Sequence, residues 1–115
     1  MARKQTENEV VAECIAWLRE RGWVARRQHV GTFQPISGGA PVRMGENGEC
    51  DWRCFRAAHG KCIEYFEWEA KSPGKKPRPD QLEYIAKRRH QGFNATWADS
   101  LEMLQEWYFE VAGYE

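Results

Sequence analysis

The sequence lacks an excess of charge of either sign and has no long apolar run. Lysine plus arginine and aspartate plus glutamate both number 17, so no overall basic field indicates a nucleic-acid partner. With no segment resembling a transmembrane span or the apolar core of a signal peptide, we expect a soluble, cytoplasmic protein. Internal repeats and low-complexity tracts are also absent, so nothing indicates a repeat architecture.

The chain is long enough for one compact unit. Its 115 residues can bury one core but not two, so we expect a single domain spanning residues 1–115. Hydrophobic residues make up 42% and aromatic residues 13%, a composition typical of a folded globule. The four cysteines are expected to be reduced thiols, because nothing indicates secretion.

Positive charge is concentrated in one part of the chain. The segment 71–89 carries seven cations and only two acids, Asp80 and Glu83, whereas the charged residues of 99–115 are all acidic. This segment predicts either a local basic face or a solvated loop and helix surface. The cations considered as DNA contacts are Lys75, Lys76, Arg78, Lys87 and Arg88.

The first half of the chain predicts a helix followed by extended structure. Thr6 and Glu9 form a capping-box pattern and Gly22 suits a helix end, which predicts a helix over 7–21. A short strand over 23–30 follows. The Gly- and Pro-rich segment 31–48 predicts a long loop or an irregular hairpin.

The second half alternates strands and helices. Strands over 50–56 and 62–71 are expected to form a hairpin. Pro79 fits the first turn of a helix over 80–91, which Gly92 ends. A strand over 93–97 and a final helix, capped by Asp99 or Ser100, complete the order α-β-β-β-α-β-α.

The stretch "YFEWEAK", residues 65–71, alternates in a way that predicts a strand with two different faces. Its buried face is expected to carry Phe66, Trp68 and Ala70. Its other face carries Glu67, Glu69 and Lys71. This pattern is typical of a half-buried strand, or of a site.

Asp51 begins the preceding strand, so hairpin pairing can bring it beside Glu69 and Lys71. Carboxylates suit Mg²⁺ or Mn²⁺. A lysine beside such an ion can position the attacking water and stabilise negative charge that develops on phosphorus.

An Asp followed by Glu-x-Lys on a strand, within the order α-β-β-β-α-β, resembles the PD-(D/E)XK nucleases. The stretches "TENEVV", "WLRERGW", "EAKSPGKKPRPDQ" and "RRHQGFNATWADSLEML" extend the resemblance to the small stand-alone VRR-NUC family, often found in phages. The implied fold class is α/β, with a restriction-endonuclease-like core, a mixed central sheet flanked by helices, and a C-terminal helix. The implied function is a Mg²⁺- or Mn²⁺-dependent DNA endonuclease, in the host cytoplasm if phage-encoded.

The resemblance also implies roles for individual residues. Lys71 matches the catalytic lysine, and Gln81 matches a glutamine that follows the lysine loop. Glu7 matches the N-terminal acid of the metal site, although Glu9 and Glu13 lie nearby. The implied metal ligands are Asp51, Glu69, the main-chain carbonyl of Ala70, and Glu7. Cys50 and Ala70 depart from the residues common at these positions in the family.

Two further expectations concern partners. Stand-alone members of the resembled family imply a homodimer acting on branched DNA such as four-way junctions. Trp107, Tyr108 and Phe109 cannot all face one core from a single helix, so their segment is the candidate interface. The simpler alternative is that the segment closes its own domain.

Two other functions stay open. Cys50, Cys54, His59 and Cys62 could form a zinc site in a nucleic-acid-binding module, although their spacing is poor for zinc and buried thiols explain them more simply. A catalytically silent DNA-binding protein of the same fold is the other alternative.

Overall fold

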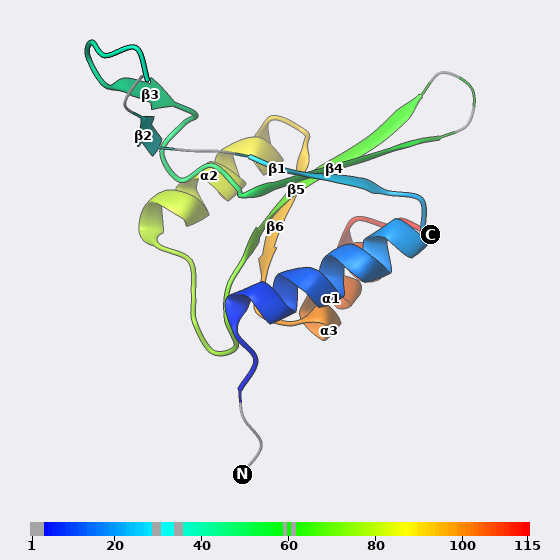
Figure 1. Cartoon of the computed structure of the whole chain (residues 1–115). Helices are drawn as coiled ribbons and strands as arrows, with labels where there is room; N and C mark the ends of the chain where they lie inside the picture. The colour runs from blue at the N-terminus through cyan, green and yellow to red at the C-terminus, as the bar shows by residue number, and fades with distance from the viewer. Residues whose placement is uncertain (1–3, 29–30, 34–35, 59, 61) are drawn as a thin grey trace.

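A four-stranded mixed sheet forms the centre of the molecule (Figure 1). The computed structural model describes residues 4–28, 31–33, 36–58, 60 and 62–115. The sheet has the order β1 (Val24–Arg27), β4 (Trp52–Ala57), β5 (Ile63–Ala70) and β6 (Asn94–Ala98). Only β5 and β6 pair in parallel. A separate small hairpin joins β2 (Gly31–Phe33) to β3 (Val42–Met44).

Helices cover both faces of this sheet. One face packs against α1 (Glu7–Glu20), α3 (Leu101–Glu106) and the π-helical turn η1 (Trp107–Val111), and the other against α2 (Pro79–His90). The expected α/β class, with a mixed sheet flanked by helices, is therefore confirmed. Within the described residues, no helix is both long and apolar enough to span a membrane.

Local signals set most element boundaries. The Thr6 hydroxyl accepts from the Glu9 amide at 3.2 Å and completes the predicted capping box of α1. Pro79 opens α2, and the Gln81 side chain accepts from the Arg78 amide at 2.9 Å. Ser100, rather than Asp99, caps α3. The predicted strand 23–30 is shorter, Val24–Arg27, and its residues 29–30 lie outside the described part of the chain.

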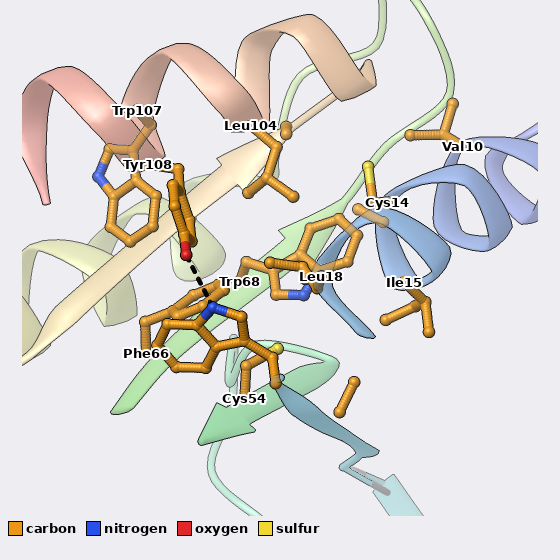
Figure 2. Close-up of a cluster of buried hydrophobic side chains, with 14 residues drawn as sticks. Val10, Cys14, Ile15, Leu18, Cys54, Phe66, Trp68, Leu104, Trp107 and Tyr108 are labelled. Atoms are coloured by element: carbon orange, nitrogen blue, oxygen red, sulfur yellow. Dashed lines mark hydrogen bonds between the residues drawn. The ribbon is translucent and has the colours of Figure 1, made fainter. Parts of the chain in front are cut away.

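The main core lies between the sheet, α1 and the C-terminal segment (Figure 2). Trp107 and Tyr108 are both buried there, because the wider π-helical turn lets neighbouring residues face the core. The Trp23 indole donates to the Tyr108 hydroxyl at 2.9 Å. Phe109 remains 43% exposed. The segment suggested as a dimer interface therefore closes its own core through two of its three aromatic residues.

Strand β5 is buried on both faces over residues 66–70. Phe66, Trp68 and Ala70 face the main core as expected. On the other face, however, Glu67 and Glu69 are only 1% and 3% exposed. Of the two alternatives, a half-buried strand or a site, the half-buried strand is wrong for this part of β5, because α2 covers the charged face. Burial of two carboxylates requires partners for both.

Candidate active site

Residues predicted from the resemblance gather in one cleft. The antiparallel register pairs Trp52 with Trp68, which places Asp51 level with Glu69 at the end of the hairpin pairing. The cleft has a volume of about 330 Å³ and is polar. Its lining consists of Glu7, Gly48, Glu49, Asp51, Glu69, Lys71, Arg78 and Gln81.

Glu69 is the centre of this site. The Asp51 amide donates to Glu69 Oε2 at 3.0 Å, and Gln81 Nε2 donates to Oε1 at 2.9 Å. Lys71 Nζ lies 3.6 Å from Oε1. Contacts from β4, β5 and α2 therefore fix the orientation of this carboxylate and bring together Asp51, Lys71 and Gln81.

Asp51 and Glu69 affect each other electrostatically. Burial raises the pKa of Glu69 to about 7, and the neighbouring Asp51 charge adds to this rise. The Asp51 amide and the Lys71 ammonium act in the opposite direction. Near neutral pH the Glu69 carboxyl group is therefore partly protonated. A positive charge beside it would favour the ionised form.

A close contact holds the loop before β4 against α2. A Cβ atom on Gly48 would lie 2.1 Å from the carbonyl oxygen of Asp80, and the φ angle of Gly48 is +77°. Only glycine combines this approach with this backbone conformation. Lys87 adds an exposed ion pair with Glu46, 2.7 Å between Nζ and Oε1. The contact places Asp51 and Gln81 on the same cleft.

The other metal ligands that the resemblance implied are Glu7 and the Ala70 carbonyl. Glu7 lines the cleft from α1. Glu9 forms the capping box, as its spacing from Thr6 predicted, and Glu13 is exposed. Ala70 follows Glu69 at the end of β5. Among the residues that the structure describes, no group of three or more His, Cys, Asp or Glu side chains is arranged to hold a metal ion.

The predicted DNA-contacting cations differ in their surroundings. Lys75 and Lys76 are exposed in the loop after β5. Lys75 also lines a hollow of about 620 Å³ that shares Glu7 with the cleft. Arg78 lines the cleft and pairs with Asp80 at 3.2 Å. Lys87 pairs with Glu46, whereas Arg88 is turned toward the sheet.

A second buried polar cluster lies along the same face of β5. The sequence pattern indicated no role for its Glu67 and Tyr84, and its Arg88 was considered only as a DNA contact. The Tyr84 hydroxyl donates to Glu67 Oε1 at 2.5 Å, and Arg88 Nε lies 3.3 Å from Glu67 Oε2. Arg88 Nε also donates to the Tyr84 oxygen at 2.9 Å. Spacing along α2 could have suggested the pair, since Tyr84 and Arg88 are four residues apart and share one helix face.

The cysteine arrangement does not support the zinc alternative. Cys50 packs on the α2 side of the sheet, whereas Cys54 lies in the main core. Cys50 precedes β4, so strand alternation does not govern its direction. Cys62 is exposed, all four cysteines are free, and His59 lies outside the described residues. Burial raises the pKa of Cys54 to about 12, so this thiol stays neutral.

Comparison with known proteins gives no assignment. No protein-family model, curated protein or solved structure matches this chain.

Proposed function

We propose that the protein is a metal-dependent DNA nuclease of the PD-(D/E)XK type with a restriction-endonuclease-like core, similar to the VRR-NUC family. The observation that carries this proposal is the meeting of Asp51, Glu69 and Lys71 in one polar cleft. These residues come from the ends of two paired strands. Gln81 supports the proposal further, because its amide holds the Glu69 carboxylate from α2.

The donor set fits a divalent cation. The Asp51 and Glu69 carboxylates face the same cleft, and the raised pKa of Glu69 reflects both burial and the adjacent Asp51 charge. A cation held by both acids would offset that repulsion. We assign Asp51, Glu69 and the Ala70 carbonyl as ligands of Mg²⁺ or Mn²⁺, with Glu7 completing the acidic side of the cleft. When bound, such an ion lowers the pKa of water and stabilises charge on a phosphoryl oxygen.

The chain's own residues supply the remaining chemistry. Lys71 is 14% exposed beside Glu69, where its ammonium can orient the attacking water and stabilise negative charge on the phosphate. Gln81 keeps the Glu69 carboxylate oriented. Lys75 lines the hollow that shares Glu7 with the cleft, and Arg78 lines the cleft itself. In this proposal these two cations and the adjacent exposed Lys76 bind neighbouring phosphates.

A plasmid-nicking assay tests this function. The parent protein should nick DNA with Mg²⁺ or Mn²⁺ and not with chelator. Asp51→Asn and Lys71→Ala should each reduce the rate at least about 100-fold, because each removes a group that acts on the reacting phosphate. The exposed Glu13→Gln serves as a matched loss of one acid. Asp51→Asn or Lys71→Ala cutting as fast as the parent would show that the assignment is wrong.

The substrate proposal is branched DNA cut by two copies of the chain. A single site cuts one strand, and a two-fold junction is most simply cut by two copies related by the same symmetry. Cleavage of a four-way junction should therefore exceed cleavage of a linear duplex of the same sequence, and light scattering should give twice the mass of one chain. A monomer that cuts both equally would exclude the dimeric junction cutter but leave the nuclease chemistry in place.

A further inference from the structure

Helix α2 covers only part of its face of the sheet. The part of this face near the β4–β5 turn is exposed. Figure 1 shows that this end of the hairpin projects away from α2. The strand register places one residue from each of β1, β4 and β5 in a row. Phe93, immediately before β6, contacts the last of them, Tyr65. We call Val24, Phe55, Tyr65 and Phe93 the apolar row.

The apolar row is accessible. Val24 is 40%, Phe55 37% and Phe93 48% exposed, and Tyr65 is partly exposed. Rings from different strands meet edge to face, with 6.4 Å between the centroids of Tyr65 and Phe93. Large side chains held in this way at the surface present flat apolar faces to a partner.

Cations border the row on the side toward the active site. Arg26 lies opposite Arg53 in the sheet, and the Arg88 guanidinium lies 5.8 Å from the Phe93 ring centroid. The acids near these arginines, Glu49 and Glu67, are buried and already paired with Arg53 and Arg88. The exposed charge on this face is therefore positive.

A pocket lies where the row meets the cations. It has a volume of about 330 Å³ and is lined by Arg53, Tyr65, Glu67, Arg88 and Phe93. This volume is within the range of about 300–1,000 Å³ found for small-ligand sites. Arg53 Nε is buried and has no hydrogen-bond partner among the described residues, so a ligand that brings an acceptor would satisfy it.

We infer that this pocket and the apolar row bind an unpaired nucleotide of a DNA strand. Aromatic faces stack on bases, and arginines bind the phosphates. Bases inside a duplex cannot offer a free face to Tyr65 or Phe93. This inference rests on the proposed action on DNA. It implies that the substrates have a single-stranded segment beside the bond that is cut.

The position relative to the active site agrees with this substrate. Gln81 and Arg88 lie at opposite ends of α2, seven residues apart, which is about 10 Å along the helix. A strand bound in the pocket therefore needs only a few nucleotides to reach the cleft. A second copy of the chain fits this surface less well, because a two-fold interface centred on the pocket would bring the arginines of both copies close together.

Fluorescence anisotropy in the presence of chelator tests the inference without cleavage. The probes are a labelled single strand of about 12 nucleotides and the same strand as a duplex. The variants are Tyr65→Ala and Phe93→Ala, with Phe93→Tyr to keep the ring. Phe109→Ala is the matched control, since Phe109 is similarly exposed but packs against Trp17. Urea unfolding checks that each variant is folded.

We expect the single strand to bind the parent more tightly than the duplex, and each alanine variant in the row to weaken strand binding about 5-fold or more. Phe93→Tyr and Phe109→Ala should bind like the parent. Unchanged strand binding in both Tyr65→Ala and Phe93→Ala would overturn the inference. The inference would also be overturned if these variants changed the oligomeric state in light scattering but did not change strand binding. That result would assign the surface to protein association.

The nicking assay keeps the two proposals separate. If parent protein nicks DNA with metal but the row variants bind the strand normally, the nuclease proposal stands and the nucleotide pocket falls. If strand binding depends on Phe93 while no DNA is cut with either metal, the pocket stands and the nuclease proposal falls.

Discussion

At the scale of single residues, Glu69 is set apart by its surroundings rather than by its chemistry. It is 3% exposed, close to a second acid, and held by two hydrogen-bond donors and an ammonium. In the unfolded chain the same carboxyl group is surrounded by water. Folding therefore raises its pKa from 4.5 to about 7, and stability becomes linked to pH.

The first prediction at this scale concerns that link, measured by urea unfolding in chelator. Between about pH 4.5 and pH 7, the folded protein keeps the Glu69 proton that the unfolded chain has lost. Its contribution to stability is therefore fully present below pH 4.5 and decreases as pH rises toward 7, by at most about 3 kcal/mol. Glu69→Gln should remove this part of the pH dependence.

Comparing the slopes of unfolding free energy against pH removes any loss of stability that the substitution causes equally at every pH. Glu69→Gln loses one hydrogen bond at every pH, because an amide cannot accept at both ends, so only the change with pH is informative. Glu13→Gln, which removes an exposed acid from α1, is the control. Parallel stability curves for the parent and Glu69→Gln would contradict the prediction.

At the scale of elements, the packing of α2 on the sheet determines the shape of the candidate site. Helix α2 contributes Gln81 to the cleft and covers Glu67 with Tyr84 and Arg88. The loop that leads into β4 approaches the start of α2 at Gly48. A wider separation there would move Gln81 away from Glu69 and open the cleft.

We therefore predict that Gly48→Ala destabilises the protein and slows cleavage. The added Cβ would meet the Asp80 backbone at 2.1 Å, and backbone atoms cannot move aside like a flexible side chain. Gly22→Ala is the matched control, because its φ is +87° and nothing lies within 4 Å of the added atom. In urea unfolding, Gly48→Ala should cost about 1–3 kcal/mol more than Gly22→Ala. Equal costs would mean that the loop adapts without strain.

At the scale of the whole molecule, the position of the charges matters more than their sum. The formal net charge is zero, yet the loop after β5 carries two exposed lysines, Lys75 and Lys76. Lys75 lines the hollow that shares Glu7 with the cleft. The Gly74 amide donates to Asp99 at 3.0 Å and holds this loop near the end of β6. Neither lysine has an ion-pair partner within the described part of the chain.

We predict that these two lysines contribute to the salt dependence of duplex binding. Replacing both with alanine should reduce the slope of log affinity against log salt by about 1.8, or 0.9 for each phosphate that is no longer neutralised. Arg19→Ala, which removes an exposed cation from α1, should leave the slope unchanged. The measurement is a salt titration of duplex binding in chelator. An unchanged slope in the double variant would place the duplex elsewhere, with Arg26 and Arg27 as the next candidates.

Several features followed from the sequence because their causes are local. The capping box of Thr6 and Glu9, the start of α2 at Pro79 and the alternation of β5 each depend on residues a few positions apart. The meeting of Asp51 with Glu69 and Lys71 also followed, because a hairpin fixes which residues lie side by side.

Only the tertiary structure decided which faces are covered. Alternation in β5 puts Glu67 and Phe66 on opposite faces, but it does not predict that α2 buries Glu67. It also does not predict that Cys50 packs apart from Cys54, or that Phe93 stays exposed. Each of these depends on contacts between elements far apart in the chain. The sequence thus brought Asp51, Glu69 and Lys71 together through strand alternation and hairpin pairing, whereas the burial and raised pKa of Glu69 and the pocket beside Tyr65 and Phe93 arise from the packing of α2 on the sheet.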